Sequence, residues 1–334
     1  MRFPATCGVL MSAILCGHAA LGAGASPADC KLLKAADLEV RVLPDGTVLV
    51  PARVADKDVW FVAATVGAYP LVTESGARLL GLQAKPISSR TETGSRTRPA
   101  EIGYSGRVQK QVTLRPFLLG QLSMTGAAAL LVADPSGVPS EFEGKPMVGR
   151  LGTNLFRMVD VELDLANERV RLFKATDCAQ PVYWGGEVTS TRMRFDRNGA
   201  MYFTMELEGQ NISTSLMSGR NPAALDESIA RQYFGFDSPR PASAEESAEG
   251  RFVAMSLSAA GLNVRNARVE LSPSVVQQCG ATIAASEDHS IQYAECTNVV
   301  PFSLGLAVLK KLRVYASAKQ EMLYFTAAAA PPTP

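Results

Sequence analysis

Four cysteines and one histidine are the side chains beyond residue 25 best suited to redox, metal or nucleophilic chemistry. They are Cys30, Cys178, Cys279, Cys296 and His289. A zinc site needs closely spaced ligands such as Cys-x-x-Cys, and no two of these cysteines have that spacing. An even number in an exported chain instead indicates disulfides, for which four cysteines allow three pairings. We favour Cys30 with Cys178 and Cys279 with Cys296, because the second pair closes a short loop and the first joins the two ends of one domain. The alternative is four buried free thiols.

Serine hydrolase, nucleotide-binding and metalloprotease chemistry find no matching motif. A Ser-His-Asp arrangement needs a histidine, and His289 lies within the loop that Cys279 and Cys296 would close. No Walker A loop, no Gly-x-Gly-x-x-Gly after a strand and no His-Glu-x-x-His is present. We therefore expect His289 to be an exposed loop residue, and we expect no cofactor and no metal.

The segment 1–25 is typical of a secretory signal peptide. It carries one charge, Arg2, followed by an apolar stretch from Val9 to Leu21 and by small residues at 23–25. The apolar stretch is too short to span a bilayer, and no stop-transfer pattern follows it. The sequence predicts a chain that is periplasmic or extracellular after removal of the signal, with no transmembrane segment.

The composition is that of a folded, nearly neutral protein. Apolar residues form 47% of the 334 residues, and 33 Lys and Arg balance 32 Asp and Glu. Removing the signal removes Arg2 and no acid, which leaves 32 basic and 32 acidic side chains. Nucleic-acid binding normally requires a strongly basic domain, so no nucleic-acid partner is expected. The length allows two domains.

The chain repeats itself once, at a constant offset along the sequence. Leu151-Gly152 recurs as Leu304-Gly305, and 304 minus 151 gives an offset of 153. The same offset relates further pairs: Asp45-Gly46 and Asn198-Gly199, Val54 and Leu207, Val59 and Ile212, Glu74 and Glu227, and Ala77-Arg78 and Ala230-Arg231. A period this long indicates two copies of one domain, because solenoid repeats are about 20 to 50 residues long.

Each copy is predicted to consist mainly of strands. The segments 48–55 and 201–207 are apolar or alternating and follow hairpin-type turn signals, so each copy is expected to open with a hairpin. Each copy is expected to close on one strand, at 161–173 and at 314–325. Short helices are expected at 73–80 and 226–233, with Thr73 and Asp226 as N-caps, and at 155–158 and 308–312.

Domain boundaries follow from the repeat. The expected parts are a signal peptide at 1–25, a first lobe at 26–175, a linker at 176–192, a second lobe at 193–326 and a disordered tail at 327–334. Pro181 and Gly185-Gly186 indicate the linker.

The order of these elements resembles that of retropepsin-like aspartic proteases. The matching pieces of the first copy are Trp60-Phe61-Val62, Ala64-Thr65-Val66-Gly67, Ala77 to Leu82, and Gly149-Arg150-Leu151-Gly152. Those of the second are Thr214-Ser215-Leu216, Met217-Ser218-Gly219-Arg220, Ala230-Arg231, and Ser303-Leu304-Gly305. The resemblance implies an all-β fold with short helices, in which two tandem retropepsin-like β-barrel lobes form a bilobed, pepsin-like arrangement around a cleft. Some other tandem β-barrel is the alternative.

The family's chemistry depends on an Asp-Thr/Ser-Gly motif in each lobe. The two aspartates share one proton and activate a water that attacks the peptide carbonyl. Here Ala64 and Met217 occupy these two dyad positions, so the resemblance assigns no catalytic residue. The acids closest in sequence are too far along the chain to substitute, namely Asp58, Glu74, Glu208 and Asp226. The resemblance leaves as binding residues Thr65, Gly67, Ser218 and Gly219.

Three functions remain open. In the first, the chain is a pseudoprotease whose cleft binds an extended peptide or protein segment by strand pairing without cutting it. In the second, it is a structural or assembly protein of the cell envelope, and Met217, Tyr69 and their neighbours fill the cleft. In the third, it is an active endopeptidase with a rearranged site. A shared fold does not decide among them.

Overall fold

The computed structural model describes most of the chain between residues 32 and 328. The described ranges are 32–63, 69–87, 110–134, 140–175, 183–184, 186–195, 201–219, 221–236, 252–259, 262–272, 283–285, 291–293 and 300–328. The predicted signal peptide, His289 and the four cysteines with their predicted pairings lie outside these ranges. No helix within these ranges is both long enough and apolar enough to cross a membrane.

The first copy is mostly strand, with two short α-helices. Its elements are β1 (Lys34–Glu39), β2 (Arg41–Val42), β3 (Val48–Val54), β4 (Lys57–Ala63), β5 (Leu71–Thr73), α1 (Glu74–Leu79), β6 (Lys85–Pro86), β7 (Lys110–Leu114), β8 (Phe117–Leu119), β9 (Leu122–Met124), β10 (Ala127–Val132), β11 (Glu141–Phe142), β12 (Lys145–Leu151), α2 (Leu155–Met158), β13 (Asp160–Asp164), the 3-10 helix η3 (Leu165–Asn167) and β14 (Arg169–Phe173).

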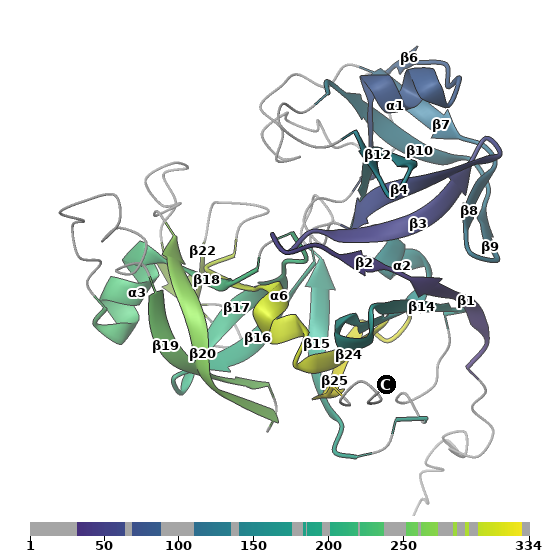
Figure 1. Cartoon of the computed structure of the whole chain (residues 1–334). Coiled ribbons are helices and arrows are strands. Elements are labelled where there is room, and N and C mark those ends of the chain that lie inside the picture. The colour runs from purple at the N-terminus through teal and green to yellow at the C-terminus, as the bar shows by residue number, and fades with distance from the viewer. Residues whose placement is uncertain are drawn as a thin grey trace, which may run out of the picture.

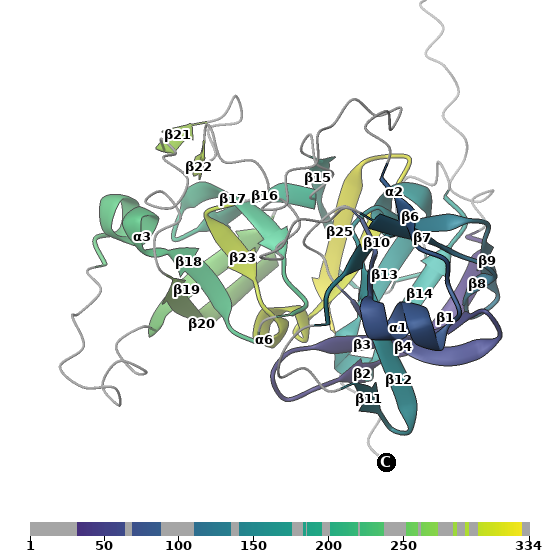
Figure 2. The same ribbon diagram turned by 90° about the horizontal axis from the view of Figure 1, so that it is seen from above.

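The described part of the second copy repeats the main part of this order. Its elements are β15 (Thr189–Phe195), β16 (Met201–Leu207), β17 (Gln210–Leu216), β18 (Ala223–Asp226), α3 (Glu227–Phe234), β19 (Phe252–Ala259), β20 (Leu262–Ser272), β21 (Ile283–Ala285), β22 (Ile291–Tyr293), β23 (Phe302–Leu304), α6 (Leu306–Leu309), β24 (Leu312–Ser317) and β25 (Met322–Ala327). In Figure 2 the strands of the second copy lie to the left and those of the first to the right, with β25 between them.

Backbone conformation repeats at the same offset as the sequence. The turn between β3 and β4 places Ala55 and Asp56 at φ 47° and 64°, and the turn between β16 and β17 places Glu208 and Gly209 at φ 46° and 79°. Two successive residues with positive φ form the hairpin turn whose twist matches that of the strands. The two copies therefore share local geometry even where their turn residues differ.

The first helix of each copy has the predicted N-cap. The Thr73 hydroxyl accepts the N–H of Gly76 at 3.1 Å, and an Asp226 carboxylate oxygen accepts the N–H of Ser228 at 2.8 Å. Each bond satisfies one of the N–H groups that a helix start leaves without a partner. The helix expected at 308–312 instead begins two residues earlier, at Leu306, because Gly305 is its N-cap.

The prediction of one closing strand per copy is wrong, since each copy closes on a hairpin. β13 pairs antiparallel with β14, and β24 pairs antiparallel with β25. Glu168 and Glu321, which correspond to each other by the repeat offset, turn the chain with φ 51° and 53°. Glutamate rarely adopts positive φ, so the residue type gave no turn signal. β15 begins at Thr189, within the segment 176–192 expected as a linker, and pairs with β25.

One sheet joins the two copies. Six neighbouring strands follow the order β1, β14, β13, β24, β25 and β15, so three come from each copy. β13 and β24 make the junction by antiparallel pairing. In Figure 1 this shared sheet lies below and between the first barrel, at the upper right, and the second barrel, at the left. The two lobes are thus connected by backbone hydrogen bonds.

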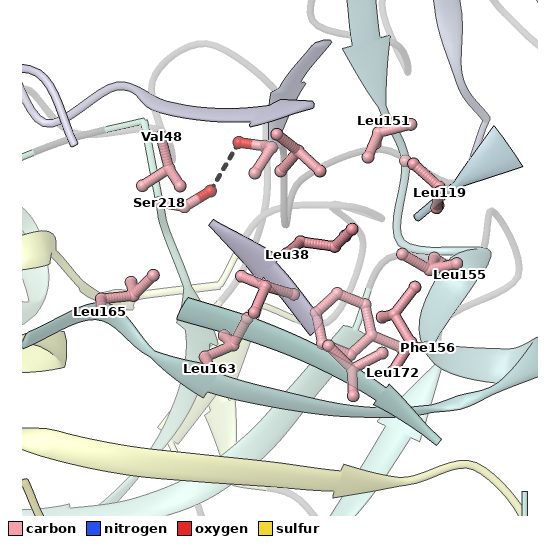
Figure 3. A pocket seen from close by; sticks show the side chains of 15 residues that line it. Leu38, Val48, Leu119, Leu151, Leu155, Phe156, Leu163, Leu165, Leu172 and Ser218 are labelled. Carbon is pink, nitrogen blue, oxygen red and sulfur yellow. Dashed lines mark hydrogen bonds between the residues drawn. The ribbon is translucent and has the colours of Figure 1, made fainter. Parts of the chain in front are cut away.

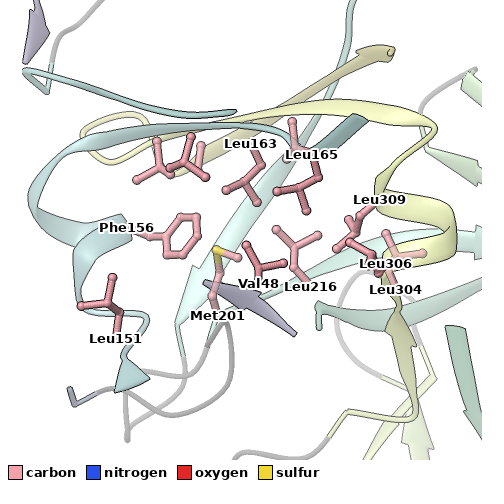
Figure 4. Close-up of a cluster of buried hydrophobic side chains, with 14 of the residues drawn as sticks. Val48, Leu151, Phe156, Leu163, Leu165, Met201, Leu216, Leu304, Leu306 and Leu309 are labelled. Carbon is pink, nitrogen blue, oxygen red and sulfur yellow. The ribbon is translucent and has the colours of Figure 1, made fainter. Parts of the chain in front are cut away.

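In the register of the β13–β24 pairing, the twofold axis that relates the two copies passes between two particular residues. Glu162 of β13 lies opposite Tyr315 of β24, and these two positions also correspond to each other by the repeat offset. Val161 and Leu163 beside Glu162 point into the main hydrophobic core, which contains buried residues of both copies. Figure 4 shows Leu163 and Leu165 of the first copy near Leu306 and Leu309 of the second.

A buried ionic network covers the other face of the shared sheet. The Glu162 carboxylate is fully buried, accepts a hydrogen bond from the Trp184 indole at 3.1 Å, and forms ion pairs with Arg171 and, at 2.8 Å, with Arg313. The Tyr315 hydroxyl donates to Asp160 at 2.8 Å. Burial and the nearby Asp160 carboxylate raise the pKa of Tyr315, so its hydroxyl stays protonated and remains a donor.

Candidate functional site

The candidate site lies where β4 and β17 end. β4 ends at Ala63, immediately before the first dyad position, and β17 ends at Leu216, immediately before Met217. β12 runs parallel to β4 and sets Leu151 beside Ala63, while β23 runs parallel to β17 and sets Leu304 beside Leu216. Each residue in one pairing corresponds to its counterpart in the other by the repeat offset. The two strand ends are therefore built alike.

A hydrogen bond connects the two strand ends across the copies. The Ser218 hydroxyl donates to the carbonyl oxygen of Ala63 at 2.7 Å, as the dashed line in Figure 3 shows. Ser218 is 3% exposed and Ala63 is half-buried, so this bond is partly shielded from water. It joins the residue after one dyad position to the residue before the other. The role of Ser218 as a binding residue stays a prediction, because this contact is made to the protein's own backbone.

Met217 lies at the second dyad position with its backbone fixed. Its N–H donates to the carbonyl oxygen of Leu304 at 2.9 Å, and its side chain is half-buried. A thioether carries no titratable proton and is only a weak hydrogen-bond acceptor. Gly219, two residues on, is exposed, and a Cβ added there would meet no atom within 4 Å. Ala64, Thr65 and Gly67 lie outside the described residues.

A glycine allows the second half of the site to pack closely. A Cβ added to Gly305 would lie 2.0 Å from the carbonyl oxygen of Pro222, a distance that no side chain tolerates. Gly305 follows Leu304, whose carbonyl accepts the N–H of Met217, and Pro222 leads into β18. The Leu-Gly repeat that first indicated the duplication thus keeps the site's supporting strands in contact.

An apolar cavity of about 40 Å³ lies beneath the strand ends (Figure 3). Ser218 contributes to its wall, and its other lining residues are apolar, among them Leu38, Val48, Ala63, Leu151 and Phe156. The cavity is too poor in polar groups to hold an ordered water well. Nothing in the sequence pointed to it.

Three of the four acids closest in sequence to the dyad positions have partners in the described structure. Asp226 is 3% exposed and caps α3. Asp58 is hydrogen-bonded to Arg53 at 2.8 Å, and this bond holds the pKa of Asp58 below its usual value. Glu208 accepts the N–H of Ser256. That no other acid replaces a dyad carboxylate stays a prediction.

No described group of three or more His, Cys, Asp or Glu side chains could hold a metal ion.

Sequence reasoning passed over Arg150, a half-buried residue on β12 next to the cavity-lining Leu151. Arg150 lies opposite Val62 of β4, two residues before the first dyad position. The sequence did offer one signal for Arg150: it is an arginine between Gly149 and Gly152, at a position where the second copy has Ser303.

Comparison with known proteins finds similarity in structure alone. No protein-family model matches the sequence, and no curated protein matches it. Among solved structures, basic 7S globulin from soybean superposes with a TM-score of 0.50 at 9% identity, over 89% of this chain and 96% of that one. An aspartic proteinase from Irpex lacteus aligns over 89% of this chain and 99% of its own, at 11% identity and a TM-score of 0.48.

The likeness to basic 7S globulin and the sheet shared by the two copies confirm the predicted fold class: the chain is all-β with short helices and has the bilobed, pepsin-like arrangement of two β-barrel lobes.

Proposed function

We propose that the protein is a pseudoprotease that binds an extended peptide or protein segment between its two lobes and does not cut it. The observation that carries this proposal is Met217, which holds a dyad position next to the Ser218 to Ala63 bond. With Ala64 at the other dyad position, neither residue can share a proton or polarise a water. The two strand ends keep the arrangement that would hold a dyad but lack its two acids. This supports binding without cleavage as the function.

Cleavage and binding are tested with one peptide library. The mature protein is incubated with the library between about pH 3 and pH 7, which includes the acidic values at which a carboxylate dyad holds a single shared proton. The double variant Ala64→Asp, Met217→Asp is treated in the same way. We expect no cleavage by the wild type and peptide binding measurable by fluorescence polarisation. Cleavage by the double variant would support an intact site geometry.

Two outcomes would contradict the proposal. Cleavage by the wild type that is lost in Thr65→Val or Ser218→Ala would assign catalysis to a different arrangement. An inert protein that binds no library member would favour the structural or assembly role, with Met217 and Tyr69 filling the space between the lobes.

The proposal also includes export. The composition of the segment 1–25 supports removal of a signal peptide, and the four remaining cysteines would then form disulfides in an oxidising compartment. Mass spectrometry of the protein recovered from the periplasm or medium tests both points. A mature mass starting near residue 26 and four cysteines that resist alkylation until reduced are expected. Retention of the segment 1–25 would contradict the signal, and four alkylatable cysteines would contradict the disulfides.

A further inference from the structure

One edge of the shared sheet is formed by β1. Within the described residues, β1 pairs with β14 and with no other strand. The N–H of Val40 donates at 2.9 Å to the carbonyl oxygen of Glu168, just before β14. In an antiparallel ladder, alternate residues turn their main-chain groups to opposite sides. Leu38, two residues before Val40, therefore faces β14, whereas Asp37 and Glu39 turn their N–H and carbonyl groups to the open side.

A groove of about 440 Å³ passes along this edge. Asp37, Leu38 and Glu39 all line it. Leu38 also lines the apolar cavity on the core side, and successive residues of a strand point to opposite faces of a sheet. A groove that meets three successive residues follows the edge of their strand. Its volume is comparable to that of many ligand-binding pockets.

The other side of the groove crosses four neighbouring strands of the first barrel. Leu118 of β8, Arg53 of β3, Asp58 of β4 and Lys145 of β12 line it, and these strands are successive neighbours in the barrel sheet. In Figure 1, β1 lies below β8 and β9 of that barrel. Neighbouring strands are about 4.8 Å apart, so four strands span about 14 Å, a length that about four residues of extended chain cover. The groove therefore has the length of a short extended segment.

The side chains on the open edge are acidic. The Asp37 side chain is 31% exposed and that of Glu39 is 59% exposed. On the paired side of β1, Arg171 of β14 lies opposite Asp37, and Arg169 lies opposite Glu39. Opposite charges directly across two strands stabilise a sheet, and like charges destabilise it. The two acids that already face a basic strand on one side therefore favour a basic strand on the other.

The two acids also have partners on their own strand and next to it. Asp37 pairs with Lys34 at 3.0 Å, and Glu39 pairs with Arg41 at 2.8 Å. Exposed ion pairs of this kind contribute little free energy. The main-chain groups of the edge therefore supply the binding, and the acids set a preference among segments. A second copy of this chain that paired about Leu38 would place acid opposite acid, which disfavours it as the occupant.

We propose that the open edge of β1 binds an extended, basic segment of another protein as a seventh strand of the shared sheet. The segment pairs with the main-chain groups of Asp37 and Glu39, lies in the groove, and presents Lys or Arg side chains on the face of the two acids. The groove is lined by neither strand end of the candidate site. The inference therefore does not depend on a peptide between the lobes.

The test uses the mature protein and a fluorescein-labelled hexapeptide of alternating lysine and threonine, which places all its lysines on one face of a strand. Fluorescence polarisation measures binding, and hydrogen exchange followed by mass spectrometry locates it. We expect saturable binding and slower exchange in β1. Two further versions are N-methylated at every lysine or at every threonine, so that each lacks the N–H groups of one edge. One version should bind at least about ten-fold more weakly than the parent peptide, and the other should bind like it.

Glu39→Lys tests the preference for a basic segment. It should weaken binding of the lysine peptide by about two- to five-fold and strengthen binding of an alternating glutamate and threonine peptide by a similar factor. Glu206→Lys is the matched control, because Glu206 is also an exposed glutamate on a strand, but β16 is paired there on both sides, with Asn211 and Ser258 opposite. It should leave both affinities unchanged. Thermal unfolding of both variants confirms that the compared proteins are folded.

Each contrary result overturns a different part of the inference. No binding of the lysine peptide, or slower exchange confined to residues outside β1, would overturn the site and leave the interlobe proposal to its own library test. Equal affinities of the two N-methylated versions would overturn pairing through the edge. Unchanged affinities in Glu39→Lys would overturn the preference for a basic segment. Dimerisation in sedimentation velocity, with slow exchange in β1 before any peptide is added, would make a second copy the occupant.

Discussion

At the scale of single residues, the Ser218 hydroxyl makes a hydrogen bond that joins the two copies. Its neighbours in the chain lack the acids of a proteolytic dyad, yet the hydroxyl still reaches the carbonyl oxygen of Ala63 in the other copy. A partly buried carbonyl that loses its donor is costly to the extent that water cannot reach it to replace the bond. The contact therefore has a structural value that is independent of catalysis.

Ser218→Ala should lower the free energy of unfolding by about 1–3 kcal/mol, because it leaves the Ala63 carbonyl without this donor. Urea denaturation of the purified variant measures the change. Ser123→Ala, at an exposed position on β9, serves as the control and should alter stability by less than about 0.5 kcal/mol. Equal stability of both variants would show that the interlobe bond contributes nothing.

At the scale of elements, α1 depends on a side chain from a distant strand. Asp134, just after β10, accepts both the N–H of Ser75 at 2.9 Å and its hydroxyl at 2.7 Å. These bonds hold the pKa of Asp134 below its usual value. The negative charge also lies at the helix N-terminus, where it is favourable. Thr73 caps the same turn from within the chain, so the helix start has one local and one long-range cap.

Asp134→Asn should destabilise the protein at neutral pH, with an effect that fades in acid. Because the folded-state pKa lies below the unfolded-state value, the stabilisation is complete above the unfolded-state pKa and is lost as the pH falls through the folded-state pKa. Melting temperatures of wild type and variant should therefore differ by a constant amount at neutral pH and converge below about pH 4. Ser75→Ala, which retains the N–H, should show a smaller difference of the same sign. A difference that grows in acid would contradict this account.

Elements with local signals could be predicted, and those set by distant contacts could not. The caps Thr73 and Asp226 were predicted correctly, because a capping residue and its helix are adjacent in sequence. The hairpins closing each copy were missed, since the residues turning the chain are Glu168 and Glu321 rather than glycine or asparagine. Met217 and Ser218 were located by the repeat, whereas Arg150 was found only from its strand register.

At the scale of the whole molecule, the two lobes are united by one sheet and one core. β13 and β24 pair across the copies, and buried residues of both copies form a continuous cluster. Each lobe supplies one half of the site, so the geometry of the site is fixed only if the joint between the lobes is rigid. The fully buried Glu162 carboxylate, with Arg171 and Arg313 bound to it, lies at the centre of that joint.

Glu162→Gln should lower the free energy of unfolding by about 3–5 kcal/mol, because it leaves two arginines of the shared sheet without their main carboxylate. Chemical denaturation followed by Trp184 fluorescence measures the loss, since the indole donates to the same carboxylate. Glu143→Gln removes an ion pair with Arg41 at a 48% exposed site and should cost less than about 1 kcal/mol. Similar losses in the two variants would contradict a central role for the network.

The same network makes the two halves of the chain complementary and no longer interchangeable. By the repeat offset, Asp160 corresponds to Arg313, and Glu162 corresponds to Tyr315. Two identical first halves would place two glutamates opposite each other at the axis, and two identical second halves would place two tyrosines there and leave each Arg313 without the acids of β13. A symmetric pair of either half could not form this joint. The two halves therefore fit each other and cannot replace each other at this joint.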